Sequence, residues 1–152
     1  MNLAYCAEKQ RLDRAFKLAE KLGYDDEMLA HWARYLTVLT SGLIESCVRE
    51  ILSDFIEKRA APPVAAYARH YVQALSNLNE EKLKTLLGLF SPAWREAFEV
   101  TVTDEQKAAI DSIIANRHNI AHGREVGITL ARVRSYYASV VQVMEWISSE
   151  CA

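Results

Sequence analysis

The chain has 152 residues, of which 51% are hydrophobic and 25% are charged, and its formal net charge is −2 at pH 7. This length suits a single domain over residues 1–152 with its own core, and the balanced charge gives no global attraction to nucleic acid, although a local basic patch can still provide one. No apolar run approaches the roughly 18 residues of a membrane span, and the N-terminus becomes charged too early for a signal peptide, so we expect a cytoplasmic protein.

Apolar residues recur with helical spacing along nearly the whole chain, which predicts helices throughout. A first helix over 12–22 ends at Gly23. A long second helix runs from about Asp26 to about Arg59, with a broad apolar stripe, and Pro62-Pro63 stops it. Shorter helices are expected over 64–75 and 79–90.

Local start and stop signals define the remaining helices. Ser91 is a candidate N-cap with Pro92 at the first helical position. Thr103 begins the next helix, with Gln106 in capping-box spacing, and Gly123 follows its last turn. A final helix spans about 133–149. The sole β-like run, "FEVTVT" at 98–103, is short. The fold class expected is therefore an all-α helical bundle with a long second helix and short accessory helices.

The three cysteines, Cys6, Cys47 and Cys151, are far apart and form no C-x-x-C pair. They are expected to be free thiols in a reducing compartment, not a disulfide framework or a zinc site. No cofactor is expected.

The segment "RHNIAHG" at 117–123 concentrates Arg117, His118 and His122 at the end of the helix that Thr103 begins. Histidine exchanges a proton near neutral pH, and arginine offers a charged planar fork that matches phosphate oxygens. The pair suits cleavage of RNA: histidine deprotonates a ribose 2′-hydroxyl while arginine stabilises charge on the phosphate. This chemistry requires no metal.

Two geometric points qualify this interpretation. Five residues place Arg117 and His122 about 140° apart on a regular helix, so they share a face only if the helix relaxes near Gly123. One histidine also does not easily serve as both base and acid, whereas two copies of the motif across a symmetric dimer supply both roles. The alternatives are a solvated helix end with cations near the C-terminal dipole, or a zinc pair at His118 and His122, for which no third ligand is evident.

Several neighbouring residues have two interpretations each. Glu45 either forms a surface ion pair with Arg49 or faces the Arg117 region and orients it. Asn119 either bonds phosphate or merely finishes the helix. Two interpretations also apply to Arg124, Arg132 and Arg134. They either form a basic rim that binds an RNA backbone or simply make up a solvated face.

The string "RHNIAHG" resembles the signature of HEPN domains, in which an Arg precedes a His by four to six residues and Asn, Asp or His commonly follows the Arg. Arg117, His118 and His122 match these three positions. The segments "WARYLTVLTSGLIESCVREI" and "AIDSIIANRHNIAHGREVGIT" are similar to the RiboL-PSP-type branch. The resemblance extends from about Leu29 to Trp146.

The resemblance implies a metal-independent endoribonuclease that leaves 2′,3′-cyclic phosphate and 5′-hydroxyl ends. It also implies an RNA substrate, a homodimer with a composite active site, and a role as a toxin or in antiviral defence, with an antitoxin or regulatory protein as a candidate partner. Arg117 and His122 would be catalytic, with His118 supporting them. Arg124 stands where one toxin subgroup has a modified tyrosine, which argues against that control system. The alternative is a non-catalytic dimerisation or RNA- or protein-binding module in a larger defence system.

Overall fold

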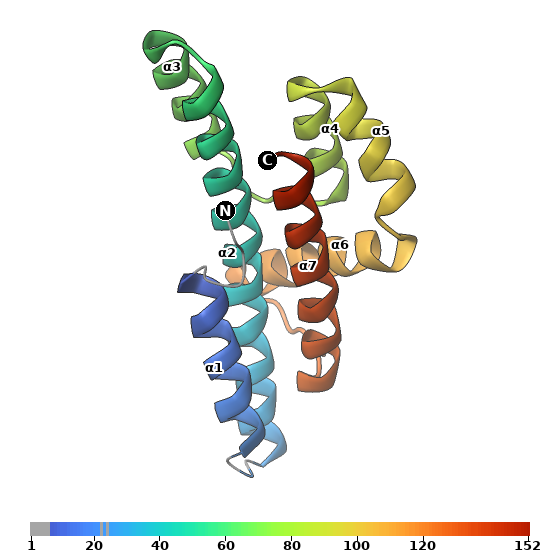
Figure 1. The fold of residues 1–152 in the computed structure, drawn as a ribbon. Coiled ribbons are helices and arrows are strands. Elements are labelled where there is room, and N and C mark those ends of the chain that lie inside the picture. Colours follow the sequence, from blue (N-terminus) through green and yellow to red (C-terminus); the bar gives the residue numbers. More distant parts are fainter. Residues whose placement is uncertain (1–6, 22, 24) are drawn as a thin grey trace.

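The computed structural model describes residues 7–21, 23 and 25–152, and within these ranges it contains seven helices and no strand (Figure 1). The all-α prediction is therefore confirmed. The helices are α1 (Ala7–Lys21), α2 (Asp26–Arg59), α3 (Pro62–Gln73), α4 (Glu80–Phe90), α5 (Pro92–Thr101), α6 (Asp104–Ala121) and α7 (Leu130–Glu150).

The long helix α2 is the axis of the fold. It begins where Asp25 caps it, accepting a hydrogen bond from Met28 N across 2.9 Å. In Figure 1, α1 lies antiparallel to the first half of α2, α3 folds back along its C-terminal end, and α7 runs beside it. α3 begins two residues earlier than expected, because Pro62 and Pro63 occupy its first positions, where a missing N–H costs nothing.

Other boundaries follow local chemistry. The capping box of Thr103 and Gln106 is present at the start of α6. The β-like run is divided between the end of α5 and a short link, and Val102 is buried. α7 begins three residues before the expected start, since the Thr129 side chain accepts from Arg132 N across 3.2 Å.

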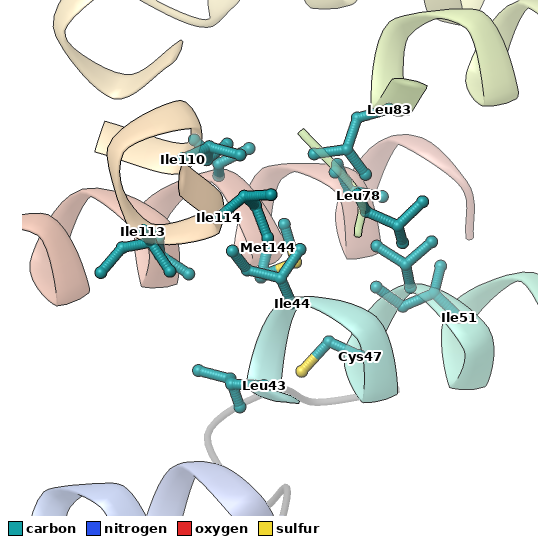
Figure 2. Packing of buried hydrophobic residues seen from close by; sticks show 14 of the residues in the cluster. Leu43, Ile44, Cys47, Ile51, Leu78, Leu83, Ile110, Ile113, Ile114 and Met144 are labelled. Carbon is teal, nitrogen blue, oxygen red and sulfur yellow. The ribbon is translucent and has the colours of Figure 1, made fainter. Parts of the chain in front are cut away.

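The core is centred where α6 crosses α2 and α7 (Figure 2). Each buried aliphatic side chain there contributes about 1.5–3 kcal/mol of transfer free energy, so the crossing fixes the axis of α6 firmly. The labelled residues of this core come from α2, α4, α6, α7 and the link between α3 and α4: Leu43, Ile44, Cys47, Ile51, Leu78, Leu83, Ile110, Ile113, Ile114 and Met144.

Cys47 and Cys151 are buried, and Cys6 lies outside the described residues. Burial, with the negative charge of Glu150, raises the pKa of the Cys151 thiol to about 12. In the described part of the chain, every helix is too short or too polar to cross a membrane.

Candidate functional site

The end of α6 keeps its helical hydrogen bonds up to the capping residues that terminate it. The backbone N–H of His122 donates to His118 O across 3.1 Å, as in an uninterrupted helix. Gly123 then takes a φ of +67°, its N–H donates to Ile120 O, and the N–H of Arg124 donates to Asn119 O across 2.9 Å. These two bonds form a Schellman cap. The helix therefore does not relax before Gly123, and His122 stays on the side where helical spacing puts it.

The guanidinium of Arg117 is held by a residue that the motif does not contain. Arg117 Nη1 donates a hydrogen bond to Asn77 Oδ1 across 3.0 Å. Asn77 lies in the α3–α4 connector (residues 74–79) and has a φ of +52°, a left-handed conformation that asparagine tolerates better than most residues. The side chain of Arg117 is thereby fixed between α6 and the connector.

The connector is fastened in turn to the middle of α2. Glu45 Oε1 accepts a hydrogen bond from the backbone N–H of Asn77 across 2.8 Å. Arg49, one turn further, donates to the carbonyl oxygen of Leu75 and pairs with Glu45 Oε2 at 3.5 Å. Glu45 therefore reaches Arg117 only through Asn77. Glu45 accepts a hydrogen bond from the backbone N–H of Asn77, and the side chain of Asn77 accepts one from Arg117.

The two histidines of the motif lie together. The rings of His118 and His122 are 4.4 Å apart between centroids, with 61° between their planes, and both residues are exposed. Among the described residues, no hydrogen bond joins Arg117 to either ring. A single chain thus presents a fixed guanidinium and, at the same helix end, a pair of accessible imidazoles.

A groove of about 520 Å³ opens beside His118, between α6 and the connector. The connector contributes Asn77 and Asn79, and α6 contributes its face around His118. The full lining is Asn77, Asn79, Asp111, Ile114, Ala115, His118 and Asn119. The groove combines amide side chains, one carboxylate and the two apolar residues Ile114 and Ala115 next to the motif.

The guanidinium groups of the three candidate rim arginines differ in the groups that they already contact, and so in their availability to bind an RNA phosphate. Arg124 Nη1 donates to Asn119 Oδ1 across 3.2 Å, at the end of α6. The guanidinium of Arg132 lies over the ring of Tyr136 at 5.9 Å. Arg134 forms an ion pair with Glu20. Arg124 is therefore the one that the contacts fix at the motif, whereas the charge of Arg134 is already met by a carboxylate.

His118 and His122 have the i, i+4 spacing of a metal-binding pair. Within the described ranges, however, no three His, Cys, Asp or Glu side chains gather closely enough to hold a metal ion. The zinc interpretation therefore gains no third ligand of these types from the described residues.

Sequence reasoning missed Asn77, Asn79 and Asp111. The string "SNLN" follows a helix, and asparagine is common both in left-handed turns and at N-caps, where Asn79 indeed accepts from Lys82 N across 3.0 Å. That signal indicates a turn. It does not indicate which distant side chain the turn will meet.

Comparison with known protein families gives a match for the chain. The RiboL-PSP-HEPN family model matches residues 7–152. Searches of curated proteins and of solved structures return no significant match. Because the family match covers essentially the whole chain and includes the motif at 117–123, the chain belongs to the RiboL-PSP-HEPN family.

Proposed function

We propose that this protein is a metal-independent endoribonuclease that acts as a homodimer. The observation that carries the proposal is the end of α6, where Arg117 is held by Asn77 while His118 and His122 expose their rings. HEPN domains are often ribonucleases that bind RNA and dimerise, which supports an RNA-related function for the same residues.

The proposed reaction uses the RNA's own ribose as the nucleophile. A neutral His122 takes the proton of the 2′-hydroxyl, and the 2′-oxygen attacks the adjacent phosphorus. Arg117 donates N–H groups to the phosphate oxygens, on which negative charge builds. The bond from phosphorus to the 5′-oxygen then breaks, and that oxygen takes a proton from a second imidazolium. The products are a 2′,3′-cyclic phosphate and a 5′-hydroxyl.

The dimer is proposed because the base and the acid act on opposite sides of the phosphorus, whereas the two imidazoles of one chain lie side by side. Within one chain His122 packs against His118, about 140° around the helix from the position of Arg117. A twofold axis through the α6 ends brings a second copy of the same exposed patch to the first. Each phosphate then lies between two motifs, with one histidine as base and the other as acid. His118 and Asn119 support the site as polar contacts.

The biological setting that we propose is cytoplasmic, as a toxin or in antiviral defence, with an antitoxin or other regulatory protein restraining the activity. The reason for proposing restraint is that His118 and His122 are exposed, so the proposed nuclease would reach cellular RNA without a further opening step. Arg124 occupies the position of the modified tyrosine of one toxin subgroup, so the restraint proposed here does not act through that residue.

The test is cleavage of total RNA in excess EDTA. We expect wild-type protein to generate fragments with cyclic phosphate ends, and Arg117→Ala and His122→Ala each to reduce the rate at least a hundredfold, as loss of acid–base or charge-stabilising groups typically does. Arg14→Ala and His70→Ala are matched controls, since both side chains are exposed on other helices. Retained cleavage in the two motif variants contradicts the assignment.

The alternative is a non-catalytic module that dimerises and holds RNA or a protein. It predicts that wild-type protein generates no new RNA ends under any condition, whether its ligand is RNA or a protein. Size-exclusion chromatography does not separate the two hypotheses, since both predict a dimer, whereas the fragment ends do.

A further inference from the structure

We propose that the groove between α6 and the α3–α4 connector binds a single unstacked nucleobase of the RNA and prefers guanine or uracil to adenine. The inference rests on the proposed function, because it places the base of the substrate beside the catalytic motif. The volume of about 520 Å³ lies within the range of roughly 300–1,000 Å³ that is usual for small-ligand sites.

Three asparagines of the groove have their oxygens occupied. Asn77 Oδ1 accepts from Arg117, Asn79 Oδ1 accepts from the backbone N–H of Lys82, and Asn119 Oδ1 accepts from Arg124. Each partner is an N–H donor without acceptor capacity, so the oxygen of each amide must be the atom that faces it.

The three amide nitrogens are consequently directed elsewhere. Over residues 7–21, 23 and 25–152, no hydrogen bond uses Nδ2 of Asn77, Asn79 or Asn119, although the Nδ2 of Asn116 on the same helix does donate, to Ser112 O. Because all three residues line the groove, their unbonded N–H groups are the donors that we assign to a ligand there.

One acceptor balances these donors. Asp111 Oδ1 accepts from the backbone N–H of Glu80 across 2.9 Å, which fixes the carboxylate at the groove. A carboxylate oxygen accepts more than one hydrogen bond, and Asp111 is exposed. The lining also includes the apolar residues Ile114 and Ala115, which add an apolar contribution to the wall that a base would meet.

This pattern matches a base that has a carbonyl oxygen beside a ring N–H. Guanine and uracil share that arrangement, so their carbonyl oxygens meet the amide donors while their ring N–H meets Asp111. Adenine has neither group, and leaves the carboxylate facing a ring nitrogen lone pair. Single-stranded RNA is commonly recognised by such hydrogen bonds to splayed-out bases. We expect a discrimination of about tenfold in affinity, equivalent to about 1.4 kcal/mol, which is within the range of a good bidentate contact to a base.

The test uses oligonucleotides that cannot be cleaved, because their 2′-hydroxyls are methylated. Wild-type protein is titrated with an all-adenine tetranucleotide and with versions that have one guanine or one uracil, and binding is followed through the side-chain amide NMR signals. We expect about tenfold tighter binding of the guanine or uracil version, with shifts of the Asn79 and Asn119 signals.

Two variants isolate the donors. Asn79→Asp and Asn119→Asp keep an oxygen for Lys82 N and for Arg124 but remove the amide N–H groups, so the preference for guanine or uracil over adenine should fall to about twofold or less. The readout is this ratio, which cancels the general effect of added negative charge. Asn116→Asp adds the same charge on α6 outside the groove, and it should keep the ratio of the wild type.

The outcomes separate the inference from the proposed function. Equal affinity for all three tetranucleotides, or no binding of any, overturns the inference even if wild-type protein cleaves RNA. A clear base preference that the aspartate variants abolish supports the base-binding groove even if no cleavage occurs, and in that case the ribonuclease proposal is the one that fails.

Discussion

Arg117 Nη1 donates to Asn77 Oδ1 across 3.0 Å, which joins the motif at the end of α6 to a connector 40 residues earlier in the chain. The connector depends in turn on α2, through the bond from Asn77 N to Glu45. Three separate segments therefore determine where the guanidinium lies. This arrangement makes the position of Arg117 a property of the tertiary fold.

Replacing Asn77 with glycine tests this positioning. Glycine adopts a φ of +52° without strain, and it keeps the backbone N–H that donates to Glu45. The fold should therefore stay intact while Arg117 loses its acceptor. We expect the rate of RNA cleavage to fall about tenfold, the equivalent of roughly 1.4 kcal/mol. The measurements are single-turnover cleavage and urea unfolding. Asn77→Asp, which keeps an oxygen for Arg117, is the control, and wild-type rates in Asn77→Gly argue against a positioning role.

Removing the carboxylate of Glu45 should destabilise the fold. The Glu45 side chain is 16% exposed and accepts from Asn77 N. In Glu45→Ala that partly buried N–H loses its partner, at a cost of about 1–3 kcal/mol, whereas Glu45→Gln keeps an oxygen acceptor and should lose less. Urea unfolding at pH 7 measures both. Glu50→Ala, on an exposed position of α2, should change stability by less than about 0.5 kcal/mol, and an equal loss at Glu45 and Glu50 contradicts the role of the connector bond.

Much of the fold was predictable because its boundaries are set by local chemistry. α2 runs between the expected ends, Asp26 and Arg59, since Asp25 caps its start and Pro62-Pro63 prevent its continuation. The capping box at Thr103 and the left-handed Gly123 each involve only residues that are close in the sequence. Signals of this kind need no knowledge of tertiary packing.

The site was predictable only in part, for the same reason. The sequence places Arg117, His118 and His122 at one helix end because they are neighbours in the chain. The contact between Arg117 and Asn77 depends on how α6 crosses α2 and α7, which the buried side chains at the crossing decide together. Helical periodicity indicates which face is buried, but it does not indicate which connector will lie against the polar side.

We expect the free energy of unfolding to depend on pH through the carboxyl group of Asp13, which lies at the contact between α1 and α7. Burial raises the pKa of Asp13, but hydrogen bonds from Lys9 and Tyr137, at 2.8 and 2.7 Å, outweigh this effect and leave the pKa below its ordinary value. The stabilisation is therefore complete above the unfolded pKa of about 4, and it is lost as pH falls through the lower folded value.

Asp13→Asn should accordingly be less stable than wild type at pH 7, and this difference should shrink as pH falls below about 4. The Asp13 side chain is 38% exposed, so solvent screening limits the difference to about 1 kcal/mol or less. Urea unfolding at pH 7, 5 and 3 measures it. Tyr137→Phe, which removes one of the two bonds, should lose part of the same pH dependence. A difference that stays constant between pH 7 and pH 3 contradicts the assignment.

Gly123 and Gly127 form a matched pair for testing the end of α6. An added Cβ meets nothing within 4 Å at either glycine, but Gly123 has a φ of +67° and Gly127 lies outside the left-handed range. Gly123→Ala should therefore cost about 1–2 kcal/mol through backbone strain alone, whereas Gly127→Ala should be neutral or slightly stabilising. Urea unfolding compares the two.

The cap also determines where His122 lies, because the residue immediately precedes Gly123 and bonds back to His118 O. We expect Gly123→Ala to relieve its strain by unwinding this last turn, which would move the ring of His122 away from that of His118. Cleavage by Gly123→Ala should therefore fall under conditions in which the protein is still fully folded, and Gly123→Asn, which tolerates the left-handed conformation, should recover much of the rate. If Gly123→Ala cleaves RNA as fast as the wild type does, the placement of His122 does not depend on the Schellman cap.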